Sequence, residues 1–438
     1  MSRPPALVHV DSVSTEMALA SVEPARARGM EVILLCPIGA APTDRSGLAA
    51  VVELPSMALP ALRAALGELD RRWAVRALAC PYGPFHEVGF LAGDVATLRA
   101  ERGLAGPSRD ALRRATNKLL AREALDAAGV PDVPFALVEA PADLERVARQ
   151  VGFPCILKPI TGVGASLVYR CDDAEQARAA FREACERLPR AHHAPVRMAP
   201  HEVREGGVAR RFDPRRSMLA EAYLPGREVS VECLALDDRV VPLLVHDKLD
   251  VEETAATVLE HLLVCPPARF TPAELRQLEA HATACVEALG LRRVLCHVEL
   301  RWDPDRGPRL LEVNPRIGAG CVTDSLRTFL DVDSAELELA LLLGETPALP
   351  GGPRTDERHA MIFLFSPRSG VLEAVEGLER LLLVPGVRVV RRMAEEGRPV
   401  GGDVEESFVA GVWARSADAE AARRLLGRVR ERVRIHVR

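Results

Sequence analysis

The chain has 438 residues, which at roughly 100–200 residues per domain is enough for two to four domains with sizeable cores. Its formal charge of −5 excludes the basic balance of a protein that coats nucleic acid, and 48% hydrophobic with 27% charged residues is an ordinary globular composition. We therefore expect small-molecule partners and no nucleic acid partner.

The ten cysteines contain no C-x-x-C pair, and the first residues, MSRPPALVHVDS, lack the apolar stretch of a signal peptide. No run approaches the roughly 18 uncharged apolar residues that are needed to span a bilayer. These features predict a cytoplasmic protein with no membrane partner.

The first 105 residues alternate apolar runs with helical patterns, which is typical of a small doubly wound α/β domain. The expected strands and helices are Ala6–Val10, Met17–Arg28, Glu31–Leu35, Leu59–Asp70 and Val75–Cys80. The sequence DSVSTE follows the first strand, so there is no G-x-G-x-x-G dinucleotide fingerprint.

The next part of the chain reads as α+β. Ser108 can cap a helix over Arg109–Ala128 that carries Lys118, with Gly129 and Pro131 as the stop. A strand over Cys155–Lys158, a glycine-rich loop, a strand over Leu167–Cys171 and a helix over Ala174–Leu188 follow. Residues 189–217 are rich in Arg, Pro and Gly, and we expect a mobile lid there.

Strands then resume, and the helix that begins at Thr271 has the capping box T-P-A-E. The expected elements are strands at Met218–Tyr223, Glu228–Leu236 and Arg239–His246, a helix from Thr271 to Gly290, a hairpin of Val294–Arg301 with Arg309–Val313, and a helix at Ser334–Leu343. The end of the chain predicts an α+β unit with strands at His359–Phe365 and Val387–Arg392 and a helix at Ala417–Val433. We expect divisions at 1–105, 106–222, 223–352 and 353–438.

The hairpin HVELRW…RLLEVNPR carries the strongest group of chemical residues. Glu312 and Asn314 share one face of their strand because strand side chains alternate, and Glu299 lies on the paired strand. Three oxygen ligands on one face suit Mg²⁺, and Arg316 could pair with a transferred phosphate. The alternative is a solvated polar face.

Two further motifs are weaker. In CILKPITGVGAS, Lys158 ends a strand, and the loop that runs to Ser166 lets backbone N–H groups approach phosphates; a hairpin turn with a surface lysine is the alternative. In AEAYLPGREVSVE, the segment at Tyr223 and Leu224 offers backbone groups to an adenine, and Glu228 could accept from ribose hydroxyls; the alternative is an ordinary β-turn.

The order of these pieces resembles the ATP-grasp superfamily over roughly residues 1–350, and the tail HAMIFLFSPRSGVLEAVEGLERLLLVPGV resembles the C-terminal unit of its L-amino-acid ligase branch. The resemblance implies an ATP-grasp fold with a doubly wound α/β N-terminal domain, a lid subdomain and a C-terminal α+β unit. It also implies an ATP-dependent carboxylate–amine ligase that forms a peptide or amide bond through an acyl phosphate and releases ADP and phosphate. The cofactors would be ATP and two Mg²⁺ ions, for which Mn²⁺ could substitute, and a homodimer is left open.

The resemblance also implies roles for individual residues. Arg316 and Lys158 would act in catalysis, with Arg316 on the acyl phosphate or the substrate carboxylate. The nucleotide would contact Lys118, Lys158, Ser166, Glu221, Tyr223, Leu224 and Glu228. The metal ions would be held by Glu299, Glu312 and Asn314.

Two segments depart from the branch pattern and bear on the substrate. In VLEHLLVCPP, Glu260 would meet a substrate amine, because no lysine or arginine near it in sequence supplies a partner, but Leu263 stands where a histidine is common. The alternative places Glu260 in solvent. Gly318 and Gly320 follow Arg316 where relatives are bulky, which suggests a larger pocket for the acid.

Two groups of residues outside these motifs and two alternative functions remain. His246, Asp247 and Lys248 are expected in a solvated turn, and Cys321 is expected to be a small apolar filler and not a nucleophile. A bicarbonate-activating enzyme like biotin carboxylase and a non-catalytic nucleotide-binding regulatory module are the alternative functions.

Overall fold

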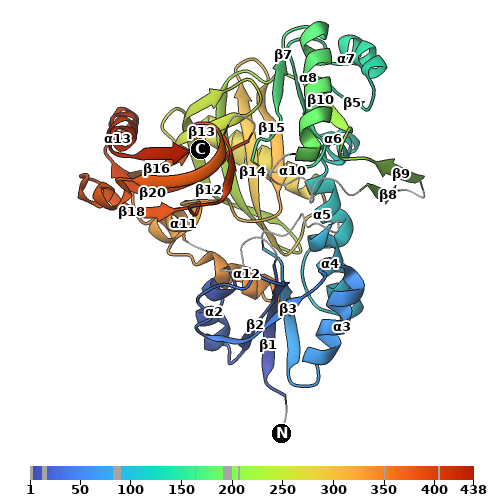
Figure 1. The fold of residues 1–438 in the computed structure, drawn as a ribbon, viewed down its shortest axis with the longest axis vertical. Helices are drawn as coiled ribbons and strands as arrows, with labels where there is room; N and C mark the ends of the chain where they lie inside the picture. The colour runs from blue at the N-terminus through green and yellow to red at the C-terminus, as the bar shows by residue number, and fades with distance from the viewer. Residues whose placement is uncertain are drawn as a thin grey trace.

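The computed structural model describes residues 3–11, 17–81, 90–162, 164–190, 200–205, 208–349, 351–402 and 405–438. Within these residues no helix has both the length and the apolar character needed to cross a membrane. The ribbon in Figure 1 runs from an N-terminal α/β unit, in blue, to a C-terminal unit, in red, that lies against the central sheet.

The N-terminal unit is a parallel four-stranded sheet in the order β3-β2-β1-β4, as expected for a doubly wound domain. Its elements are β1 (Pro5–Val10), α1 (Met17–Ala20), α2 (Val22–Ala27), β2 (Glu31–Pro37), β3 (Leu48–Leu54), α3 (Leu59–Leu69), β4 (Ala74–Ala79) and α4 (Leu91–Glu101). Strands β1 and β2 are apolar and buried along most of their length because helices cover both faces.

The helix expected over Arg109–Ala128 is wrong as a single element. The chain forms α5 (Arg109–Thr116) and α6 (Lys118–Ala127), which are separated by Asn117 in an extended conformation. The Asn117 Oδ1 accepts hydrogen bonds from the backbone N–H groups of Leu119 and Leu120, at 3.1 and 3.2 Å, and so caps α6. Lys118 therefore lies at the first turn of a helix, where its own N–H donates to the Ile160 carbonyl at 2.7 Å.

A small antiparallel sheet, β5-β10-β6-β7, packs on two helices beside α6. Its elements are β5 (Phe135–Val138), α7 (Leu144–Gln150), β6 (Cys155–Pro159), β7 (Tyr169–Cys171), α8 (Ala174–Arg187) and β10 (Met218–Ala222). Within the predicted lid, β8 (His201–Glu205) and β9 (Val208–Phe212) form a regular hairpin instead of irregular chain. Residues 191–199 and 206–207 of that prediction lie outside the described residues.

An antiparallel eight-stranded sheet, β15-β14-β11-β12-β13-β16-β20-β18, forms the centre of the molecule. Its first five strands along the chain are β11 (Arg227–Ala235), β12 (Val240–Glu253), β13 (Val258–Cys265), β14 (Val294–Asp303) and β15 (Gly307–Asn314). Helix α10 (Pro272–Ala288) covers one face of this sheet through Leu278, Ala282 and Cys285, and it has the predicted Thr271–Glu274 capping box.

The end of β12 differs from the prediction. The expected strand stopped at His246, whereas β12 continues to Glu253 because β13 pairs with it from Asp247 onwards. His246, Asp247 and Lys248 are therefore in the middle of a strand and are at most 2% exposed, so the expected solvated turn is wrong.

The C-terminal unit extends the central sheet. Its elements are β16 (Arg358–Phe365), β17 (Ser369–Glu376), β18 (Val387–Arg392), β19 (Pro399–Gly401), β20 (Phe408–Ser416), α13 (Ala419–Arg432) and β21 (Arg434–Val437). Strand β16 pairs with β13, so hydrogen bonds cross the division expected at residue 352. Helices α11 (Val322–Leu330) and α12 (Ser334–Leu342) connect the two parts, and α12 packs on the N-terminal unit through Leu339 and Leu342.

Candidate active site

One face of the central sheet is lined by charged side chains. On β14 the alternation puts His297, Glu299 and Arg301 on this face, while Val298 and Leu300 join the apolar core under α10. The register places Glu299 opposite Glu312 of β15 and opposite Ser230 of β11. The polar residues of these three strands therefore meet on one side of the sheet.

Glu299, Glu312 and Asn314 come together as the alternation predicted. The Asn314 Nδ2 donates to Glu312 Oε1 at 2.9 Å and to Glu299 Oε1 at 3.4 Å. The Lys118 ammonium lies 3.0 Å from Glu312 Oε2. Two carboxylates and an amide within one hydrogen-bonded group are the hard oxygen donors that Mg²⁺ prefers, so this donor set fits the ion.

Lys248 is the centre of the buried charges beside this group. Its ammonium donates to Glu228 Oε1 at 2.7 Å, to Glu299 Oε2 at 3.0 Å and, in a short contact, to Glu260 Oε1. The ammonium has three donors, and each has a carboxylate acceptor. The prediction that Glu260 lacks a basic partner is therefore wrong: Lys248 lies 12 residues away in sequence, on the neighbouring strand.

The environment shifts the pKa values of these carboxyl groups in opposite directions. Burial, reinforced by the negative charges of Glu299 and Glu228, raises the pKa of Glu260 to about 7 even though Lys248 opposes the shift. For Glu299, the attraction of Lys248 and of His297 exceeds the cost of burial and holds the pKa well below its usual range. Glu299 therefore stays ionised while Glu260 lies near its midpoint at neutral pH.

The sequence reasoning missed His297 and Glu232. The His297 Nδ1 lies 2.5 Å from Glu232 Oε1, and its Nε2 lies 3.4 Å from Glu299 Oε1. Against the effect of burial, the Glu232 carboxylate raises the pKa of His297 to about 10, so the ring carries a positive charge at neutral pH. Strand alternation could have found both residues, because Glu232 is in phase with Glu228 on β11 and His297 with Glu299 on β14.

A second buried network holds Lys158, the lysine near the end of β6. The Lys158 ammonium lies 2.7 Å from Glu221 Oε2, and the other oxygen of Glu221 accepts from the Arg122 Nε at 2.7 Å. Arg122 is 1% exposed and also pairs with Asp132 at 2.6 Å. Both oxygens of Glu221 are thus engaged by protein cations, and Arg122 is a positioning residue that nothing in its local sequence indicated.

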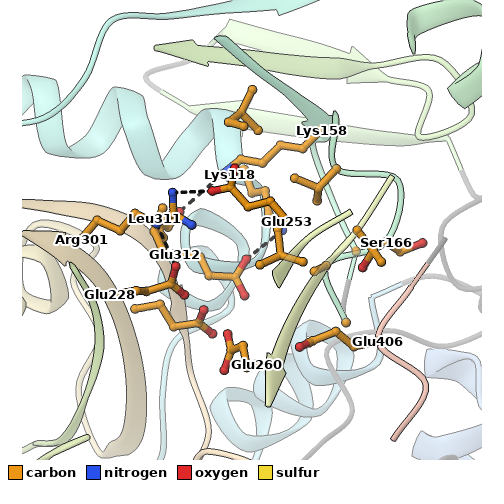
Figure 2. Close-up of a pocket in the computed structure, with 18 of the residues that line it drawn as sticks. Lys118, Lys158, Ser166, Glu228, Glu253, Glu260, Arg301, Leu311, Glu312 and Glu406 are labelled. Atoms are coloured by element: carbon orange, nitrogen blue, oxygen red, sulfur yellow. Dashed lines mark hydrogen bonds and ion pairs between the residues drawn. The ribbon is translucent and has the colours of Figure 1, made fainter. Parts of the chain in front are cut away.

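These networks border a cavity of about 220 Å³ (Figure 2). The predicted site residues that line the cavity are Lys118, Lys158, Ser166, Glu221, Leu224, Glu228, Glu260, Glu299, Glu312 and Arg316. Tyr223 does not line it: its hydroxyl donates to Glu253 Oε1 at 3.1 Å, and the Arg170 guanidinium lies 4.4 Å from its ring centre. Leu224 and Glu228 both accept from Arg301, at 2.9 and 2.8 Å, which fixes the strand ends at this part of the cavity.

The loop after Arg316 contributes Ala319 to the cavity, and its two glycines pack against other side chains. A Cβ at Gly318 would lie 2.7 Å from the His297 Nδ1, and one at Gly320, whose φ is +68°, would lie 2.4 Å from the Phe363 ring. Each glycine therefore permits a close approach to its neighbour.

The C-terminal unit also reaches the cavity. Met361, Phe363, Glu406 and Phe408 line it, and Figure 2 shows the Glu406 carboxylate pointing inwards near Glu260. The Glu406 N–H donates to the Gly164 carbonyl at 2.8 Å, which joins this unit to the glycine-rich loop. Cys321 is fully buried in an apolar cluster, as expected for a filler.

Comparison with known families agrees with this architecture. Residues 151–324 match the ATP-grasp domain family, and residues 362–438 match the L-amino acid ligase C-terminal domain 2. The crystal structure of L-amino acid ligase from Bacillus licheniformis superposes with a TM-score of 0.80 at 20% sequence identity, over 100% of both chains. The ATP-grasp fold that the sequence motifs implied is thus confirmed.

The curated relatives match this chain over only part of their own length. Carnosine synthase 1 of Gallus gallus is 30% identical over 295 residues, which are 64% of this chain and 28% of that protein. Alanine–anticapsin ligase of Bacillus subtilis (strain 168) is 26% identical over 266 residues, which are 57% of this chain and 52% of that protein. The chain therefore covers less than two thirds of either relative.

Proposed function

Residues 151–324 are an ATP-grasp domain and residues 362–438 an L-amino acid ligase C-terminal domain, and from this premise we propose that the chain is an ATP-dependent carboxylate–amine ligase whose substrates are amino acids. The observation that carries the proposal is the meeting of Lys118, Glu312 and Arg316 in one cavity wall with Glu299 and Asn314 beside them. Cations and hard oxygen ligands at one point suit the transfer of a phosphoryl group.

The nucleotide would lie along the cavity from Leu224 to Glu312. The ammonium groups of Lys118 and Lys158, with the backbone near Ser166, would face its phosphates, and Glu228 would face the ribose. Two Mg²⁺ ions held by Glu299, Glu312 and Asn314 would neutralise charge on the transferred phosphoryl group.

The carboxylate substrate would be presented to the γ-phosphate near Arg316, whose guanidinium would hold the acyl phosphate. Glu260 would face an ammonium group of an amino acid. The apolar side chains Met361, Phe363 and Phe408 would surround the rest of that substrate and exclude water from the reactive intermediate. The similarity to carnosine synthase 1 and to alanine–anticapsin ligase supports amino acids as the substrate class.

The test is a phosphate-release screen of amino acid pairs with Mg-ATP, with the products identified by mass spectrometry. We expect ADP and phosphate in a one-to-one ratio with a condensed product. AMP and pyrophosphate as the stoichiometric products, or turnover that requires bicarbonate and no second amino acid, would overturn the proposal.

A further inference from the structure

Glu406 brings a carboxylate from the C-terminal unit into the cavity of the proposed active site. The other described residues of that unit that line the cavity are apolar, namely Met361, Phe363 and Phe408. Figure 2 shows the Glu406 side chain directed towards Glu260, and its carboxylate lies against the backbone N–H of Glu260. Two carboxylates from distant parts of the chain therefore lie side by side in this cavity.

The loop that carries Glu406 is fixed by hydrogen bonds to three other segments. The Glu406 N–H donates to the Gly164 carbonyl at 2.8 Å, and the Ser407 carbonyl accepts from the Ser366 N–H at 3.0 Å. The Ser407 Oγ also accepts from the Gly401 N–H at 2.7 Å. The backbone that presents the carboxylate is therefore in place before a ligand binds, which lowers the entropic cost of binding.

The Glu406 carboxylate has no ion-pair partner among the residues that the structure describes. Its Oε1 is buried and accepts no hydrogen bond. Lys248 donates its three N–H groups to Glu228, Glu260 and Glu299 instead. Burial and the negative charge of Glu260 raise the pKa of Glu406 well above its usual range, against the attraction of Lys248. A buried carboxylate oxygen without a partner is costly, so this group suits a cation that enters with a ligand.

Glu260 offers a second acceptor beside Glu406. Lys248 contacts the Oε1 of Glu260, whereas its Oε2 forms no hydrogen bond or ion pair within the described parts of the chain. An ammonium group carries three N–H donors, so a single ammonium can donate to one oxygen of each carboxylate. Hydrogen bonds in which both partners are charged are stronger than neutral ones, which suits this pair to a substrate cation.

We propose that Glu406 is a specificity-determining residue that binds, together with Glu260, the free ammonium group of the amino acid whose carboxylate is activated. This inference rests on the proposed ligase function and assigns part of its substrate selection to the C-terminal unit. The two carboxylates favour an acid that carries a primary ammonium group. N-acylated and des-amino acids are disfavoured, because they leave the Glu406 carboxylate in the cavity without a cation.

The test isolates the activation step with hydroxylamine, which displaces phosphate from an acyl phosphate and gives a hydroxamate. Each amino acid that the wild-type protein accepts is compared with its des-amino counterpart: L-alanine and β-alanine with propionate, and L-leucine with isocaproate. We expect Glu406→Gln, which keeps the shape of the side chain and removes its charge, to raise the KM for the amino acid at least tenfold and to change kcat less than about threefold. The preference for the amino acid in kcat/KM should narrow at least tenfold.

Glu379→Gln is the matched control, because Glu379 belongs to the same unit, has a side chain that is 70% exposed and does not line the cavity. It should change neither the KM nor the preference. An unchanged preference in Glu406→Gln would overturn the inference, and so would an equal loss with amino acids and des-amino acids, which would give Glu406 a structural role. A rise in KM for the amine substrate alone would also overturn it. A wild-type protein that forms no hydroxamate with any amino acid would instead overturn the proposed function itself.

Discussion

The Lys248 ammonium lies 3.0 Å from Oε2 of Glu299, on the oxygen that does not face Asn314. Lys248 thus pairs with one oxygen of Glu299, and the other oxygen faces the proposed metal site. The same ammonium lies among Glu228, Glu260 and Glu299, whose oxygens are all within 4.8 Å of one another. Lys248 therefore occupies the place that a metal ion would otherwise take.

We expect Lys248→Met to destabilise the protein by roughly 3–5 kcal/mol, because one buried and two partly buried carboxylates lose their counter-ion. Millimolar Mg²⁺ or Ca²⁺ should restore part of that loss, since the three oxygens then form an open cation site. Thermal unfolding with and without the ion measures the effect. A melting temperature that rises with the ion no more in Lys248→Met than in wild type would contradict this account.

The substitutions Glu312→Ala and Asn314→Ala should each lower kcat at least about 100-fold, because each removes an oxygen ligand at the phosphoryl-transfer point. ADP formation by the purified variants measures the loss, and circular dichroism verifies the fold. Asp305→Ala, in the exposed turn of the same hairpin, is the control and should keep full activity. Near-normal turnover in either variant would show that the hairpin is a polar surface and not a metal site.

Glu260→Ala should raise the KM for one amino acid tenfold or more, which corresponds to the roughly 1.5–3 kcal/mol of a charged hydrogen bond, and should change the KM for ATP little. Initial rates with each substrate varied in turn provide the measurement. Glu252→Ala, on the paired strand with a side chain 61% exposed, is the matched control. An unchanged KM for every accepted amino acid would remove Glu260 from the substrate site.

The stability of the protein should fall as the pH drops from about 6.5 to about 4. Burial lowers the pKa of His281 on α10 to about 4, so the unfolded chain takes up this proton at a higher pH than the folded one. His281→Leu removes that penalty, which amounts to at most roughly 3 kcal/mol, and should flatten the decline. Urea unfolding at a series of pH values measures it, with the more exposed His436→Leu as control. Parallel curves for wild type and His281→Leu would contradict the assignment.

The part of the site that local pattern could predict is the hairpin. The alternation of Glu312 and Asn314 and the pairing with Glu299 follow from strand geometry alone, and all three side chains meet. The sequence could also have predicted the break at Asn117, because an asparagine side chain competes for backbone N–H groups and favours a helix cap over a helix interior.

Other contacts depend on the tertiary fold. Arg122 reaches Glu221, 99 residues away, and no periodicity in α6 distinguishes it from a surface arginine. Lys248 faces Glu260 only because β12 continues beyond the predicted end and pairs with β13 through two irregularities of register. The local sequence therefore predicts Lys248 in solvent and Glu260 without a partner, and both predictions are wrong.

The pairing of β13 with β16 has a consequence for anyone who recombines such proteins. Leu262 and Val264 of β13 lie in an apolar cluster built mainly from the C-terminal unit. Cutting the chain after α12 would expose a long apolar edge strand, which invites aggregation through intermolecular pairing. A chimaera that exchanges the C-terminal unit should therefore take β13 from the same parent as β16, so that the crossover falls before Val258 and not at residue 352.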